Sequence, residues 1–228
     1  MKKIHAVFVW LGGVITETVS EAASRQLYAQ PAEKITIETR LQLRELAQEL
    51  ALGRLTGPSF CRQAIEATRS TLSAEDLAAG IQENVTARSS VLEMIKELPE
   101  TYQRWLISDY PPKWFGSIAE RLGLFSWFDE NRLIITAAAR LSRITPDIFY
   151  YLAHQTGQPL TACLMIDGVS ARAVEAVKHG LDTAIFVDAR RLRREFVLRR
   201  MLPPPPGFIF PGTKRLTQEN GKDEVKPG

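Results

Sequence analysis

Short apolar runs that alternate with amphipathic stretches are the feature that most restricts how this chain can fold. Each run is continuously apolar, too short for a buried helix and bounded by Gly, Pro, Asp or Ser, as in a strand covered on both faces. The runs span 4–10, 104–108, 132–136, 162–166 and 183–187, and helical patterns at 112–122, 146–156 and 170–179 separate the later ones. This alternation predicts an α/β fold with a Rossmann-like, doubly wound parallel sheet.

The long interval between the first two runs contains no strand pattern. It holds four helical patterns, at 37–53, 59–72, 73–85 and 90–98. Gly53 is expected to end the first of them, and Ser73 with Asp76 is expected to begin the third. The interval therefore predicts an all-helical insert over residues 17–99, with an α/β core formed by 1–16 and 100–188. In open α/β sheets such an insert lies over the carboxyl ends of the strands, where ligands bind.

Arginines dominate the segment after the last strand. They decorate a predicted basic helix over 189–202, which ends at four consecutive prolines, and a proline-rich, flexible tail over 203–228 is expected to follow. The arginines fit either a solvated helix face or a docking site for a phosphorylated, anionic-lipid or acidic partner. The candidate residues for binding such a protein partner are Arg190, Arg191, Arg193, Arg194, Phe208 and Phe210.

Length, charge and cysteine usage exclude several classes of protein. A chain of 228 residues suits one α/β domain with a small insert, and a net charge of +3 is too small to indicate nucleic acid binding. Cys61 and Cys163 lie far apart in apolar contexts, so they are expected to be buried hydrophobic residues rather than metal or redox ligands. No apolar run has the length of a membrane span, and we expect a cytoplasmic location.

Four stretches resemble, in chain order, the motifs of the haloacid dehalogenase (HAD) superfamily, in particular its phosphatase-like members with a small helical cap. They are VFVWLGGVIT, RWLISDYP, LSRITPDIFYYLAHQTG and CLMIDGVSARAVEAVKHGLDTAIFV, and the resemblance covers residues 4–188. It implies a HAD-like core in which the helical insert is the cap. It also implies phosphoryl transfer to an aspartate, helped by Mg²⁺ and by a hydroxyl and a basic residue that hold the phosphoryl group.

Three positions depart from the residues that this chemistry needs. Trp10 stands at the position of the nucleophilic aspartate, and an indole can neither attack phosphorus nor bind Mg²⁺. Gly12 stands where many members keep a second aspartate as general acid, and Gly168 replaces the second acid of the fourth motif. Loss of a directly attacking residue costs on the order of 10⁶ in rate, so aspartyl-phosphate chemistry should be abolished.

Three positions keep or approximate the family pattern, and a fourth, Asp109, replaces a residue that is often Asn in the family. Ser108 matches the phosphate-binding hydroxyl and Arg143 the basic residue of the third motif, which makes both candidates for binding an anion. Asp109 stands beside Ser108, and Asp167 matches one acid of the fourth motif. Each also has a structural interpretation: Ser108 caps a turn, Asp167 caps the next helix, and Arg143 pairs with Asp167 or Asp109.

These residues favour a HAD-like protein that has lost phosphoryl transfer and serves as a non-catalytic binding or scaffolding module. Asp167 alone is a poor Mg²⁺ site, so no metal and no cofactor is expected. The alternative is a divergent, phosphatase-like HAD hydrolase with a rearranged site. In that hydrolase Asp109 or Asp167 is the base, Ser108 and Arg143 hold the anion, and Mg²⁺ is retained through Asp167.

Overall fold

The computed structural model describes residues 3–28, 36–141, 146–208 and 210 of the chain. Five parallel strands form one sheet in the order β3-β2-β1-β4-β5. Their bounds are Ala6–Trp10 (β1), Gln103–Ser108 (β2), Leu133–Ile135 (β3), Cys163–Asp167 (β4) and Asp182–Ile185 (β5). All five predicted strands are thus confirmed, and the fold class is α/β with a doubly wound parallel sheet, as the alternation of runs indicated.

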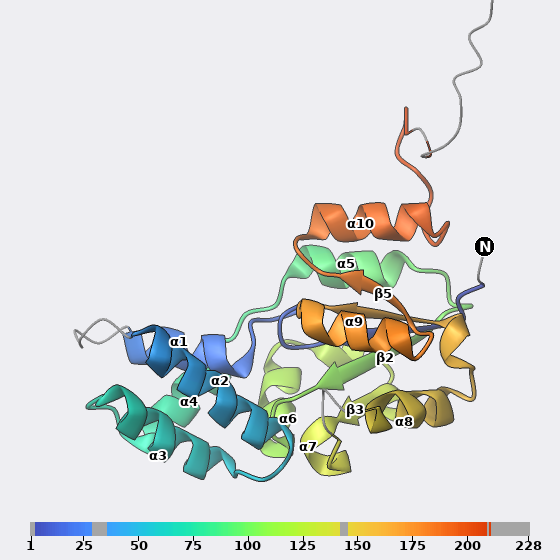
Figure 1. Ribbon diagram of the computed structural model, residues 1–228. Helices are drawn as coiled ribbons and strands as arrows, with labels where there is room; N and C mark the ends of the chain where they lie inside the picture. Colours follow the sequence, from blue (N-terminus) through green and yellow to red (C-terminus); the bar gives the residue numbers. More distant parts are fainter. Residues whose placement is uncertain (1–2, 29–35, 142–145, 209, 211–228) are drawn as a thin grey trace, which may run out of the picture.

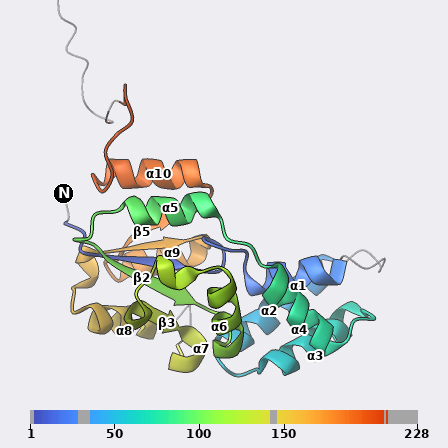
Figure 2. The same cartoon turned by 180° about the vertical axis from the view of Figure 1, so that it is seen from behind.

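Helices cover both faces of the sheet (Figures 1 and 2). One face carries α5 (Ser89–Glu97), α6 (Pro112–Arg121) and α10 (Ala189–Leu198), and the other carries α8 (Asp147–Thr156) and α9 (Ser170–Lys178). Every residue of the central strand β1 is buried, because this strand has neighbours on both sides and helices above and below. The short helix α7 (Thr136–Ala139) follows β3 directly.

Four helices form the cap, which lies beside the carboxyl end of β1 in Figure 1. They are α1 (Val19–Tyr28), α2 (Ile37–Ala51), α3 (Gly57–Thr68) and α4 (Ala74–Asn84). The expected caps are present: the Ser73 hydroxyl accepts a hydrogen bond from the Asp76 amide at 3.0 Å, and Gly53 follows α2 with a φ of +70°. Residues 11–18 form the first linker between core and cap, and residues 85–88 form the second.

The structure moves two of the expected boundaries. Helix α5, which we expected within the cap, lies beside α10 on the core (Figure 2). Arg193 of α10 pairs there with Glu97 of α5 at 2.7 Å. The apolar face of α5 is the reason, because Val91, Leu92 and Ile95 are all buried in the core cluster. The predicted basic helix forms but ends at Leu198, and residues 211–228 of the predicted tail lie outside the described residues.

Candidate functional site

A cleft of about 560 Å³ lies between cap and core at the carboxyl edge of the sheet. From the core it is lined by Gly13, Asp109 and the segment 168–172, and from the cap by α1 and by Arg44 and Gln48 of α2. The second linker contributes Arg88. We call this space the cap–core cleft. This is the position at which the fold class predicts a ligand. The burial and the contacts of each candidate residue there therefore determine which chemistry is available.

Trp10 is the last residue of β1 and is 1% exposed. The strand register pairs its backbone with that of Ile107 of β2. The guanidinium carbon of Arg172 lies 4.6 Å from the centre of the indole ring, within the range of a cation–π contact. A large aromatic side chain and a cation stacked on it therefore occupy the end of the central strand.

Asp167 ends the neighbouring strand β4 and is completely buried. The Nε and Nη2 atoms of Arg172 donate hydrogen bonds to its two carboxylate oxygens, which makes a bidentate, buried ion pair. The amide of Val169 donates a further hydrogen bond to Oδ1 of Asp167 at 2.8 Å. Both carboxylate oxygens are thus engaged by the protein. Asp167 holds the turn before α9 through the amide of Val169, whereas α9 itself has no side-chain cap, so Asp167 is not the helix cap that we expected and its main partner is Arg172.

Arg172 is the residue of the site that the sequence analysis missed. It occupies the first turn of α9, where no acidic residue is present and where the helix dipole disfavours a cation. A basic residue at that unfavourable position, five residues after an aspartate at a strand end, is a signal that could have identified the pair. Arg172 is 6% exposed, so its charge depends on Asp167 for compensation.

Close packing requires glycine at position 168 and restricts the side chain that position 12 can carry. A Cβ atom on Gly168 would lie 2.7 Å from the carbonyl oxygen of Gly13, and a Cβ atom on Gly12 would lie 2.9 Å from Oδ1 of Asp109. The turn after β1 and the turn after β4 therefore touch through their backbones. This contact leaves no room for an acidic side chain at position 168, and Asp109 fills the space above Gly12.

Ser108 lies at the end of β2 and is 1% exposed. Its hydroxyl accepts a hydrogen bond from the amide of Tyr110 at 3.2 Å, which is the turn-capping role. Ser108 is not among the residues that line the cap–core cleft, whereas the neighbouring Asp109 is. Arg143 lies outside the described residues, so its role as an anion-binding residue or as a partner of Asp167 or Asp109 stays a prediction.

The donor set at this edge of the sheet does not fit Mg²⁺. This cation needs several oxygen ligands at octahedral geometry, and the carboxylate best placed to bind it is already neutralised by a guanidinium. Within the described parts of the chain, no group of three or more His, Cys, Asp or Glu side chains could hold a metal ion. Arg172 supplies the positive charge beside Asp167.

The two linkers that join cap and core are held together by arginines. Arg88 donates hydrogen bonds through Nη1 to the carbonyls of Val14 and Thr16, at 2.9 and 2.7 Å, and its amide bonds the carbonyl of Ile15 at 2.8 Å. Arg121 of α6 bonds the carbonyl of Gln82 through Nε at 3.1 Å. These contacts fix the cap in place over the cap–core cleft.

The candidate partner residues lie on α10 and the segment after it. Arg190, Arg191 and Arg194 are exposed, whereas Arg193 is paired with Glu97. Phe208 and Phe210 contact each other at a centroid distance of 5.2 Å and are partly buried, so this expected anchor packs against its own chain. Among the described helices, none is long and apolar enough to cross a lipid bilayer.

Solved structures of HAD-family proteins have folds similar to that of this chain. A HAD family enzyme from Bacteroides thetaiotaomicron, solved with magnesium and inorganic phosphate, aligns with a TM-score of 0.61 and 17% identity over 80% of this chain and 93% of that one. L-2-haloacid dehalogenase from Xanthobacter autotrophicus, with chloropropionic acid covalently bound, aligns with a TM-score of 0.61 and 21% identity over 88% and 85%. A predicted HAD-like family hydrolase from Porphyromonas gingivalis aligns with a TM-score of 0.60 and 21% identity over 80% of this chain and 90% of that one.

No protein-family model matches the sequence, and a search among curated proteins returns no match. The structural likeness and the sheet order agree, so the fold of this chain is HAD-like: a five-stranded parallel sheet between helical layers, with a helical cap at the carboxyl end of its central strand.

Proposed function

We propose that this protein is a HAD-like module that has lost phosphoryl transfer and acts by binding. The observation that carries the proposal is the buried pair of Asp167 and Arg172 stacked on Trp10. An indole stands at the nucleophile's position, and a guanidinium holds the carboxylate that a metal would need. No cofactor is part of this proposal. The proposal includes a binding or scaffolding role through α10 and the tail, and a cytoplasmic location.

The test is hydrolysis of p-nitrophenyl phosphate and of a panel of sugar and nucleoside phosphates, with and without Mg²⁺. We expect no turnover above that of the Asp167→Ala variant, because neither nucleophile nor metal site supports it. Lys113→Ala, an exposed change on α6, is the matched control for handling and folding. If the natural chain shows turnover that requires Mg²⁺ and that Asp167→Ala abolishes, the proposal is wrong.

One observation favours the alternative of a rearranged hydrolase. Asp109 is 3% exposed and lines the cap–core cleft, so a carboxylate does face the space where a ligand would bind. In the form of this alternative that needs no Mg²⁺, Asp109 acts as the general base. The same assay separates the two: metal-independent turnover that Asp109→Asn removes and Asp167→Ala leaves intact supports the hydrolase.

A further inference from the structure

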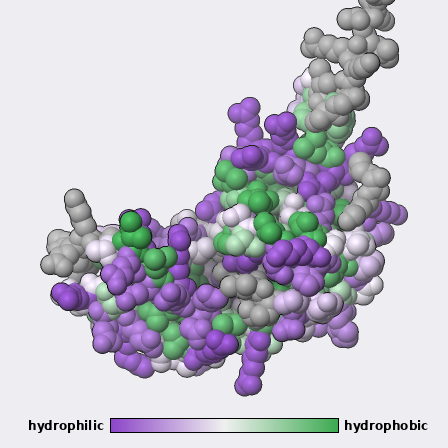
Figure 3. Space-filling view, in the orientation of Figure 1, coloured by the Kyte–Doolittle hydropathy of each residue, from purple (hydrophilic) through white to green (hydrophobic). Residues whose placement is uncertain are grey.

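Helix α10 lies on the far side of the core from the cap (Figure 1). A groove of about 590 Å³ lies along this helix. Helix α10 lines it with Arg190, Arg191, Arg193, Arg194 and Val197. Pro205 and Phe208, from the segment that follows the helix, complete it. We call this space the α10 groove. In the space-filling view, hydrophilic side chains stand along this edge of the molecule (Figure 3).

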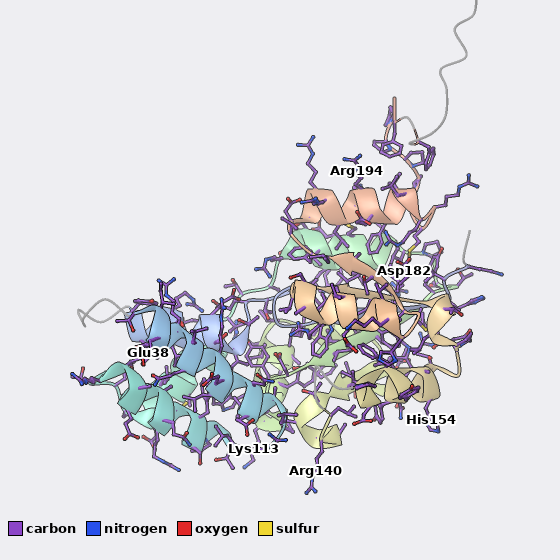
Figure 4. All side chains as sticks on the ribbon, viewed as in Figure 1. Glu38, Lys113, Arg140, His154, Asp182 and Arg194 are labelled. Atoms are coloured by element: carbon purple, nitrogen blue, oxygen red, sulfur yellow. The ribbon has the colours of Figure 1, made fainter. Side chains whose placement is uncertain are left out.

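Positive charge in the α10 groove exceeds what the protein itself neutralises. Asp188 is the acidic residue that lines the groove, and its carboxylate caps the helix by accepting from the amide of Arg191 at 2.7 Å. Glu97 takes Arg193. Within the described part of the chain, the guanidinium groups of Arg190, Arg191 and Arg194 make no ion pair or hydrogen bond; Arg194 points outward from α10 in Figure 4.

These arginines are unfavourable for the helix that carries them. Arg190 and Arg191 fall in the first turn, where the helix dipole disfavours cations, and the carboxylate beside them, that of Asp188, is used as the helix cap. Arg190 and Arg194 are four residues apart, and like charges at that spacing destabilise a helix. The face of α10 turned to the core buries Leu192 and Phe196, and this apolar contact would hold the helix in place without any of the arginines. Residues that break local rules without a structural gain are expected at functional sites.

We propose that the α10 groove binds an acidic peptide segment in extended conformation, with one apolar side chain placed against Phe208. The spacing supports this occupant: Arg190 and Arg194 are about 6 Å apart along the helix, and alternate side chains of an extended strand are about 6.6 Å apart. A carboxylate at every second position can therefore meet successive arginines. The concave shape, closed by Pro205 and Phe208, fits a chain better than the flat surface of a membrane.

This inference rests on the proposed function, because it names the partner chemistry of a binding module, yet its test is independent of catalysis. The probe is a fluorescein-labelled peptide of alternating glutamate and glycine around one phenylalanine. Its binding to the full chain is followed by fluorescence anisotropy. A peptide with glutamine for glutamate, and another with serine for phenylalanine, are the matched ligands. We expect both to bind at least about tenfold more weakly, and binding to weaken as salt screens the charges.

The decisive variants change net charge equally at two places. Arg190→Glu/Arg194→Glu should weaken peptide binding by at least about tenfold. Lys113→Glu/Arg140→Glu, at the opposite end of the molecule in Figure 4, should leave it within about twofold. Circular dichroism and thermal melting confirm that each variant folds, and Phe208→Ala tests the apolar contact without altering charge.

Three outcomes would overturn the inference: no peptide binding, equal weakening by both double variants, or arginine-dependent binding to phosphatidylserine vesicles without binding to the peptide. The last would assign the groove to a membrane. If the protein neither binds the peptide nor hydrolyses the phosphates, the inference about the α10 groove is wrong, whereas the proposed loss of phosphoryl transfer stands. Peptide binding together with Mg²⁺-dependent hydrolysis refutes the proposed function alone.

Discussion

Replacing Arg172 by methionine should cost this protein a large part of its stability. Asp167 is completely buried and Arg172 is 6% exposed, so the change leaves an uncompensated carboxylate in the interior. Breaking such a pair from one side costs about 3–5 kcal/mol. The contact with Trp10 adds up to about 2 kcal/mol when desolvated, of which methionine recovers the packing part. We therefore expect the free energy of unfolding to fall by about 4 kcal/mol.

Urea denaturation followed by tryptophan fluorescence measures this change, and a double-mutant cycle isolates the pair. Arg172→Met/Asp167→Leu should be more stable than Arg172→Met alone, because replacing both charges removes the buried unpaired carboxylate. Lys178→Met, which breaks the exposed pair with Glu175 on the same helix, is the matched control and should cost less than about 1 kcal/mol. A loss below about 1 kcal/mol for Arg172→Met, or no recovery in the double variant, would refute the account of the site.

Other residues give three further predictions. Burial raises the pKa of the Cys61 thiol to about 12 and that of Cys163 to about 11, so a disulfide exchange reagent at pH 8 should label both only after unfolding. Because the raised pKa favours the protonated thiols, unfolding free energy should fall as pH rises above 9, and Cys163→Ala should reduce the slope. Arg88→Ala should cost about 1–2 kcal/mol and speed hydrogen exchange in the linkers; unchanged exchange would contradict a fixed cap. Gly168→Ala should destabilise by about 1–3 kcal/mol in a thermal melt, because its Cβ atom would meet a carbonyl, and a neutral result would contradict the close contact.

Much of the fold could be predicted from the sequence because local patterns determine it. The central strands β1 and β4, which are covered on both faces, are almost continuously apolar, and such a run is visible in one dimension. The boundary of the cap could not be predicted in the same way. The amphipathic pattern of α5 states that one face is buried, but not whether the cap or the sheet buries it. That choice depends on tertiary packing beside α10, which the pattern of α5 alone does not contain.

The same distinction between local patterns and tertiary contacts applies to the candidate site. The proposal that Trp10 stands in place of an aspartate comes from the sequence alone, because it concerns one residue at one position of a motif. The pairing of Arg172 with Asp167 depends on where the first turn of α9 meets the end of β4 and β1. The family motif assigns no role to that arginine, and its only local signal is a cation in an unfavourable position on the helix. Likewise, the need for glycine at position 168 follows from the approach of another turn, not from its neighbours in sequence.

The central claim is that Trp10 and Arg172 occupy the places of the nucleophile and the metal. Isothermal titration of Mg²⁺ into the protein tests it most directly, with Trp10→Asp/Arg172→Asn as the comparison. The account predicts no binding heat for the natural chain and measurable binding for the double variant, since that variant supplies a second carboxylate and frees Asp167. Mg²⁺ binding by the natural chain that is lost in Asp167→Ala would contradict it.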